Sequence, residues 1–136
     1  MGFNQIQYDD ALNLKDAGLV ASTTTESTIL DIGAGFVDGL LVVDVSAVET
    51  ATGNEYFTIC LEASNVAAMT SGSVDIMRKS MGNIVAPGDA VTATGRFILP
   101  FCNEVNGTLY RYVRLYTVVA GTIASGINYS AFVAKR

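Results

Sequence analysis

Hydrophobic and polar residues alternate with a two-residue period along much of this 136-residue chain, as they do in β-strands. The pattern is clearest in residues 55–63 (EYFTICLEA), where Phe57, Ile59 and Leu61 fall on one face. Other short segments rich in β-branched and aromatic residues are approximately Thr28–Ile32, Leu40–Val48, Val74–Lys79, Val91–Leu99, Arg111–Val119 and Asn128–Val133. Turn residues separate these segments and no helix-length period intervenes, so the pattern predicts an all-β sandwich or barrel of antiparallel strands.

The first 25 residues differ from the rest of the chain. Their apolar residues are isolated, no amphipathic period links them, and they end in a Ser/Thr run. We therefore expect residues 1–25 to form an extended N-terminal arm that precedes a β domain of residues 26–136. The arm would be ordered mainly by whatever it packs against.

One loop is similar to the loop with which many methyltransferases hold S-adenosylmethionine. The apolar segment STIL leads into Asp31, Gly33 and Gly35. Such a loop requires a helix directly after the glycines, because the amides at the helix N-terminus help to position the cofactor. The residues that follow here (LLVVDVSAV) predict a strand. We therefore interpret the glycines as a turn between strands and expect no cofactor, with methyl transfer as the third and weakest hypothesis.

The composition changes the picture of the surface. Half the residues are hydrophobic and only 15% are charged, against about 25% in a typical soluble domain. The uncharged stretch Leu115–Ala134 is the one candidate for a membrane span, but its middle (GTIASGIN) predicts a turn between two strands. Charged residues interrupt the apolar residues near the N-terminus, so we expect no signal peptide there. We expect a soluble protein, made in the cytoplasm, whose surface is largely covered by other protein.

Charge and residue inventory argue against several functions. The chain has eight basic and thirteen acidic residues. The basic residues form no cluster in the sequence, so direct nucleic-acid binding is not expected. Histidine is absent, which removes the usual general base and the commonest metal ligand. We therefore expect neither an enzyme nor a metal protein. Cys60 and Cys102 lack metal spacing and are interpreted as small buried hydrophobic residues rather than a disulfide. Asn106-Gly107 predicts a tight hairpin turn.

The segment Tyr110–Val119 (YRYVRLYTVV) is the most informative strand, since neither of its faces is typical of a solvated surface. If Val113, Leu115 and Val119 face the core, the outer face carries Tyr110, Tyr112, Arg114 and Tyr116. Tyrosine and arginine are enriched at buried protein interfaces. Three alternatives remain for this face: a protein interface, packing inside the sandwich, or stacking against a sugar. The acidic charge argues against a fourth, the stacking of nucleic-acid bases.

The order of the segments resembles the small jelly-roll cement, or decoration, proteins of tailed bacteriophage capsids, in particular the stabilisers of podovirus-type heads. The resemblance covers nearly the full chain. It rests on five segments: LVASTTTESTILDIG, GLLVVDVSAV, EYFTICLEAS, TATGRFILPF and RYVRLYTVVAGT.

This resemblance implies a fold and a function. The fold would be a jelly-roll β-sandwich of about eight antiparallel strands. The protein would form homotrimers on the outside of the virion capsid and clamp neighbouring major capsid subunits after the head expands, without enzymatic activity or cofactor. Because a cement protein binds only the expanded shell, it stabilises that shell by mass action, and a trimer engages several subunits at once.

Two groups of contact residues follow as expectations. In the arm, Phe3, Tyr8, Leu12 and Leu14 would contact the capsid or a sister subunit. On the strand, Tyr110, Tyr112, Arg114 and Tyr116 would form the trimer interface. The alternative function is a trimeric β-sandwich module that binds a receptor or glycan on a phage tail or fibre.

Overall fold

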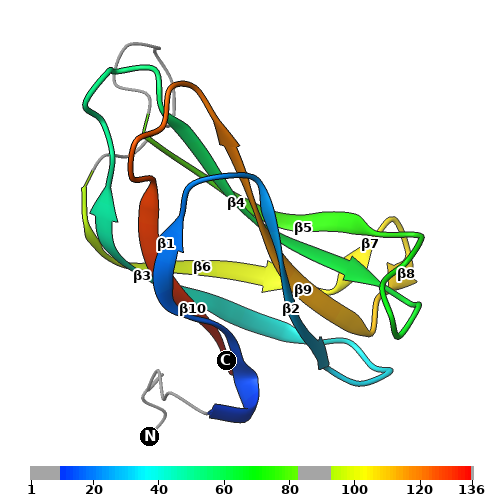
Figure 1. Ribbon diagram of the computed structural model, residues 1–136. Helices are drawn as coiled ribbons and strands as arrows, with labels where there is room; N and C mark the ends of the chain where they lie inside the picture. The colour runs from blue at the N-terminus through cyan, green and yellow to red at the C-terminus, as the bar shows by residue number, and fades with distance from the viewer. Residues whose placement is uncertain (1–9, 83–92, 136) are drawn as a thin grey trace, which may run out of the picture.

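The computed structural model describes residues 10–82 and 93–135, which form antiparallel strands and one turn of 3-10 helix (Figure 1). The elements in chain order are η1 (Asp10–Leu12), β1 (Asn13–Val20), β2 (Thr24–Asp31), β3 (Asp38–Val48), β4 (Tyr56–Ser64), β5 (Val74–Gly82), β6 (Gly95–Cys102), β7 (Glu104–Val105), β8 (Thr108–Leu109), β9 (Tyr112–Ala120) and β10 (Ile127–Lys135).

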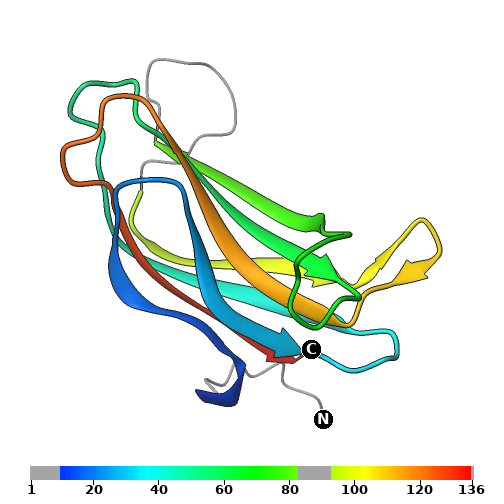
Figure 2. The same cartoon turned by 45° about the vertical axis from the view of Figure 1, so that its right-hand side comes forward.

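Eight of these strands form two four-stranded sheets packed face to face (Figure 2). Sheet A has the order β1-β10-β3-β6 and sheet B the order β2-β9-β4-β5, while β7 and β8 form a separate hairpin. Among the eight, successive strands alternate between the sheets except at β4–β5. This is the strand order of a jelly roll. The predicted all-β jelly-roll sandwich is confirmed.

The N-terminal segment differs from the prediction, because it does not remain an arm up to residue 25. β1 pairs with β10 from Asn13 opposite Phe132 to Val20 opposite Ile127, and β2 begins at Thr24. The register of β1 shifts twice, on either side of Lys15. These irregularities break the two-residue period, which is why the sequence pattern did not reveal a strand. Residues 1–9 lie outside the described part of the chain.

The other predicted strands lie within a few residues of the observed ones. The largest differences are at two strand starts: β2 begins at Thr24 rather than Thr28, and β6 begins at Gly95 rather than Val91, with positions 91 and 92 outside the described residues. The sequence did not predict β7 and β8 as strands, although it did predict their turn. Asn106 and Gly107 have φ angles of 51° and 84° and connect the paired residues Val105 and Thr108. Positive φ at both central positions is what a two-residue hairpin turn of type I′ requires.

The core lies between the sheets and follows the predicted alternation. Phe57, Ile59 and Leu61 of β4 are completely buried, as are Val113 and Leu115 of β9. One polar contact crosses this core: the Tyr129 hydroxyl of sheet A is hydrogen-bonded to the Thr117 hydroxyl of sheet B. Both side chains are fully buried. Each hydroxyl thus satisfies the other, which avoids the cost of leaving a buried polar group unpaired.

Lys15 protects the edge of the sandwich at β1. Its ammonium group donates hydrogen bonds to the carbonyls of Asp16, Gly18 and Tyr129 at 3.0, 3.2 and 3.0 Å. It also lies 4.7 Å from the centre of the Tyr129 ring. Burial lowers the pKa of this amine, and the nearby Glu26 and Asp16 carboxylates oppose that shift. A bulged edge strand that holds an inward-pointing lysine is poorly suited to pair with another strand.

Candidate interaction surfaces

The outer face of sheet B carries the side chains predicted for one side of β9. Val113, Leu115 and Thr117 point into the core, whereas Tyr112, Arg114 and Tyr116 are half-buried on the opposite side. The strand parity inferred from the sequence is therefore confirmed. The proposed role of these three residues as an interface stays a prediction.

Hydrogen bonds within the subunit hold this outer face in place. Arg114 lies opposite Glu62 on β4, with Nε and a terminal nitrogen 2.8 and 2.6 Å from Glu62 Oε1. The Tyr116 hydroxyl donates to the Asp75 carboxylate of β5 at 2.7 and 2.8 Å. Arg78 lies 3.6 Å from the same carboxylate. Burial and the bond to Asp75 raise the pKa of Tyr116. On this face, hydrogen bonds within the subunit therefore orient Arg114 and Tyr116, and the charged groups are paired with one another.

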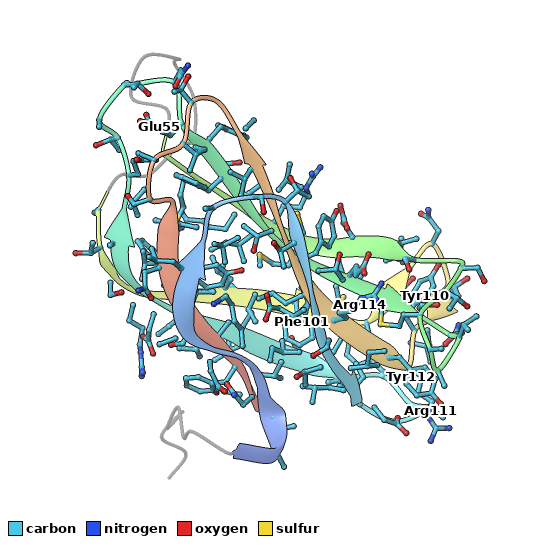
Figure 3. The ribbon with its side chains drawn as sticks, in the orientation of Figure 1. Glu55, Phe101, Tyr110, Arg111, Tyr112 and Arg114 are labelled. Carbon is cyan, nitrogen blue, oxygen red and sulfur yellow. The ribbon has the colours of Figure 1, made fainter. Side chains whose placement is uncertain are left out.

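Tyr110 does not belong to this surface, which corrects the sequence prediction. It precedes β9 and packs partly buried against the core between the sheets. Its backbone N–H donates to the Asn103 carbonyl at 2.9 Å, and its carbonyl accepts a bond from the Asn103 side chain at 2.8 Å. Since β9 begins only at Tyr112, the strict alternation assumed from residue 110 does not hold there. In Figure 3, Tyr110 lies beside Arg111 and Tyr112 at one end of the sandwich.

The structure places only two of the four predicted contact residues of the arm, and these two lie in different environments. Leu14 is 1% exposed and forms part of the main core, so it cannot contact a partner and that prediction is wrong. Leu12 packs half-buried against the core and lines a surface hollow with Phe36 and Val133. Phe3 and Tyr8 lie outside the described residues.

One end of the sandwich exposes apolar side chains from three connections that are distant in sequence. Phe36 of the β2–β3 loop is 62% exposed, and Val66 of the β4–β5 loop and Leu109 of the β7–β8 hairpin are each 38% exposed. Figure 2 shows these three connections gathered at the same end of the molecule. We call Phe36, Val66 and Leu109 the loop-end surface. Contiguous exposed apolar surface marks interaction sites, so this end of the sandwich is a candidate interaction surface.

Asn103 fixes the loop-end surface in position. Its buried side chain accepts a bond from the Val37 N–H at 2.8 Å and donates to the carbonyls of Gly35 and Tyr110 at 2.9 and 2.8 Å. It thereby joins the β2–β3 loop to the hairpin segment. The Asn65 side chain adds a bond to the Leu109 carbonyl at 2.9 Å. The sequence reasoning missed Asn103, because an asparagine between a strand and a turn carries no signal of a buried three-way contact.

An ion pair lies beside this surface. The Arg111 guanidinium binds the Asp31 carboxylate through two nitrogens at 2.8 and 2.9 Å. The Gly33 N–H donates to the same carboxylate at 2.9 Å. The hydrogen bonds from Arg111, and after them the one from Gly33, lower the pKa of Asp31. The glycine-containing stretch after β2 is therefore a turn tied to Arg111, and it leads into strand β3, so the predicted strand–turn–strand order is confirmed.

The outer face of sheet A is apolar over part of its area. Leu40 and Val42 of β3 lie opposite Ala134 and Phe132 of β10, and these four side chains form a second buried cluster. On the other side of Val42 lies Ile98 of β6, which is 44% exposed. The outer faces of antiparallel sheets are commonly polar, so the low charge of the chain is reflected in this face of the fold.

The end opposite the loop-end surface contains the buried carboxylate Glu55 (Figure 3). Glu55 accepts bonds from the Thr52 N–H and hydroxyl, both at 2.7 Å, and from the Gly53 N–H at 2.8 Å. Burial alone would raise the pKa of Glu55. The hydrogen bonds, first those from Thr52, outweigh burial and lower the pKa to about 2.

This carboxylate predicts a specific acid sensitivity. The pKa of Glu55 in the folded state lies below its ordinary value of 4.5, so its contribution to stability is complete above pH 4.5 and is lost as the pH falls towards 2. We expect the melting temperature of the wild type to fall across that interval. Glu55→Gln should melt lower at neutral pH and lose less across the same interval, as measured by circular dichroism. The exposed Glu104→Gln serves as the control; if it behaved like Glu55→Gln, the assignment would be wrong.

The sequence also led to predictions about the two cysteines, about metal binding and about a membrane span. Both cysteines are free; Cys60 is buried as predicted, but Cys102 is only half-buried. Among residues 10–82 and 93–135, no group of three or more acidic or cysteine side chains is placed to hold a metal ion. No helix in the described part of the chain is long and apolar enough to cross a membrane.

The chain was also compared with known proteins. No model of a known protein family matches the sequence, and no curated protein matches it.

Proposed function

We propose that this protein is a structural, non-enzymatic component of a virion: a capsid cement protein that binds the outside of a phage head and stabilises the expanded shell. The observation that carries the proposal is the loop-end surface. Phe36, Val66 and Leu109 are exposed at the same end of the sandwich, and the Asn103 and Asn65 side chains fasten their loops through hydrogen bonds. An ordered surface of this kind is suited to bind a protein with little loss of conformational entropy.

In this proposal the loop-end surface contacts the major capsid protein, and the outer face of sheet B joins the subunits of a homotrimer. Tyr112 and Tyr116 supply aromatic area, and hydrogen bonds to Glu62 and Asp75 already orient Arg114 and Tyr116, while the Arg111 guanidinium lies 5.6 Å from the centre of the Tyr112 ring. Burying Tyr112, Arg114 and Tyr116 between subunits would also fit the low content of charged residues, which is 15% of the chain. The jelly-roll fold and the resemblance of the segment order add support.

The trimer interface is tested by removing its aromatic side chains. We expect Tyr112→Ala and Tyr116→Ala to shift the protein from trimer to monomer at low micromolar concentration, because aromatic residues carry much of the energy of protein interfaces. The measurement is size exclusion with light scattering. Leu19→Ala is the control, since Leu19 is 60% exposed on β1 of the other sheet. If both tyrosine variants stayed trimeric, the interface would lie elsewhere.

Capsid binding is tested separately. Co-sedimentation with purified heads should show binding to expanded capsids and none to unexpanded ones. Phe36→Ala should weaken that binding while the protein remains trimeric, which separates the capsid contact from the trimer contact. Equal binding of the variant and the wild type would exclude Phe36 from the contact.

A second candidate function, recognition of a receptor or glycan, is favoured by one observation. A shallow groove on the outer face of sheet A is lined by Asp44, Arg96, Ser130 and Asn128. The buried Asn128 Oδ1 accepts no hydrogen bond from any described residue, so a ligand hydroxyl could donate to it once the side chain turns towards the groove. Affinity for glycans on an array, abolished by Asn128→Ala, would support this function; a binding-negative array would leave the cement proposal as the better account.

A further inference from the structure

The tip of the β7–β8 hairpin combines a reactive sequence with an exposed backbone. Asn106 is the only asparagine of the chain that is followed by glycine. Both residues of the turn are exposed, and Figure 2 shows the hairpin projecting from the body of the sandwich. A Cβ atom added to Gly107 would meet no atom within 4 Å outside its immediate chain neighbours. The backbone at Gly107 is therefore not crowded by residues outside the turn.

A carboxylate lies directly beside that nitrogen. Glu104 Oε1 accepts a hydrogen bond from the Gly107 N–H at 2.5 Å. The acceptor is thus already positioned to take the amide proton when the nitrogen attacks a carbonyl carbon. A carboxylate that accepts a proton from an attacking nucleophile acts as a general base.

From this geometry we propose that Asn106 is a site of spontaneous, water-consuming deamidation in the folded protein, assisted by Glu104. The Gly107 nitrogen forms a bond to Asn106 Cγ, and its proton passes to Glu104. The Cγ–Nδ2 bond then breaks and ammonia leaves with the proton that Glu104 returns, which gives a cyclic imide. Water opens the ring at either carbonyl and yields aspartate or isoaspartate. One water is consumed and one ammonia is released, without oxidant or reductant.

Neighbouring sites lack one or more of these features. Asn103 is buried and its amide is held by three hydrogen bonds. Asn54, Asn65 and Asn128 are followed by larger residues, which hinder attack by the next nitrogen. Asp38-Gly39 could form the same imide with loss of water, but Gly39 is buried within β3 and lies close to the Phe101 ring. This site is an internal comparison within the same molecule.

The modification would change the loop-end surface. Aspartate at position 106 adds a negative charge close to the exposed Leu109. Isoaspartate adds a methylene group to the backbone, which is incompatible with a two-residue turn that keeps Val105 opposite Thr108. The inference does not depend on the proposed function, although it concerns a hairpin that the proposal places in the capsid contact.

The test is incubation of the full-length folded protein at neutral pH, followed by peptide mapping with mass spectrometry and enzymatic labelling of isoaspartate. The wild type should accumulate aspartate and isoaspartate at position 106 and no isoaspartate at position 38. Glu104→Gln should slow the reaction several-fold at an unchanged fold, as checked by circular dichroism. Asn106→Gln is the matched variant that should give no product at this position.

Two results would overturn the inference. The first is a wild type that stays unmodified at position 106 while folded but reacts after denaturation, since the turn would then protect the asparagine. The second is a reaction in Glu104→Gln that is as fast as in the wild type, since Glu104 would then have no part in the proton transfer.

Discussion

Gly126→Ala is expected to destabilise the fold by about 3 kcal/mol or more. Gly126 has a φ angle of +105°, and a Cβ at this position would lie 2.2 Å from the Val20 carbonyl oxygen. That contact is with backbone where β1 ends, so no side-chain rotation can relieve it. The alanine would also adopt a backbone conformation that costs an L-residue energy. Urea unfolding monitored by circular dichroism gives the difference in free energy of unfolding.

The matched control is Gly35→Ala in the β2–β3 turn. Gly35 has no positive φ, and no atom lies within 4 Å of a Cβ added there. We expect its free energy of unfolding to stay within about 0.5 kcal/mol of the wild type. If Gly126→Ala changed the free energy of unfolding as little as Gly35→Ala, the β9–β10 loop could not lie as close to the end of β1 as the structure places it.

Phe57→Ala is expected to cost about 3–5 kcal/mol of stability, the usual range for emptying a buried aromatic site. Phe57 is completely buried between the sheets. Its removal leaves a cavity that the paired strands β5 and β9 on either side of β4 cannot close without breaking register. Thermal or urea unfolding measures the loss.

The same substitution at Phe36 tests whether an exposed phenylalanine contributes as little to stability as its position on the surface implies. Phe36 is 62% exposed, so Phe36→Ala should change the free energy of unfolding by less than about 0.5 kcal/mol. Under the proposed function it should nevertheless weaken capsid binding. A large loss of stability in Phe36→Ala would mean that the side chain belongs to the fold rather than to a binding surface.

The sequence predicted the central strands well, because their alternation is regular. In β4, Phe57, Ile59 and Leu61 share one face as predicted, and in β9 the inward and outward sides were assigned correctly. The Asn106-Gly107 turn was also predicted, since few residues other than asparagine and glycine tolerate positive φ at both positions.

The edges of the fold could not be predicted in the same way. Strand β1 contains bulges that put Leu14 and Lys15 both into buried positions, so its apolar residues do not alternate. The lysine alone indicates a solvated segment, and only the three carbonyls that surround it explain its burial. A local pattern carries no information about such acceptors, because one of them, the Tyr129 carbonyl, comes from β10, far along the chain.

The candidate surfaces were predicted only in part, for a related reason. Parity placed Tyr112, Arg114 and Tyr116 on one face correctly. The loop-end surface was missed, because Phe36, Val66 and Leu109 are isolated apolar residues in three separate loops. Only the order of strands in the two sheets brings these loops to the same end, and only the Asn103 and Asn65 side chains fix them there.

Our proposal is that this chain works as a trimeric building block of a larger assembly. Its most direct test is the absolute mass of the purified protein in solution, measured by size exclusion with light scattering from micromolar concentration downward. The account predicts a mass three times that of the 136-residue chain, persisting on dilution. A well-behaved monomer at every concentration would contradict the trimer and would leave the outer face of sheet B without its proposed partner.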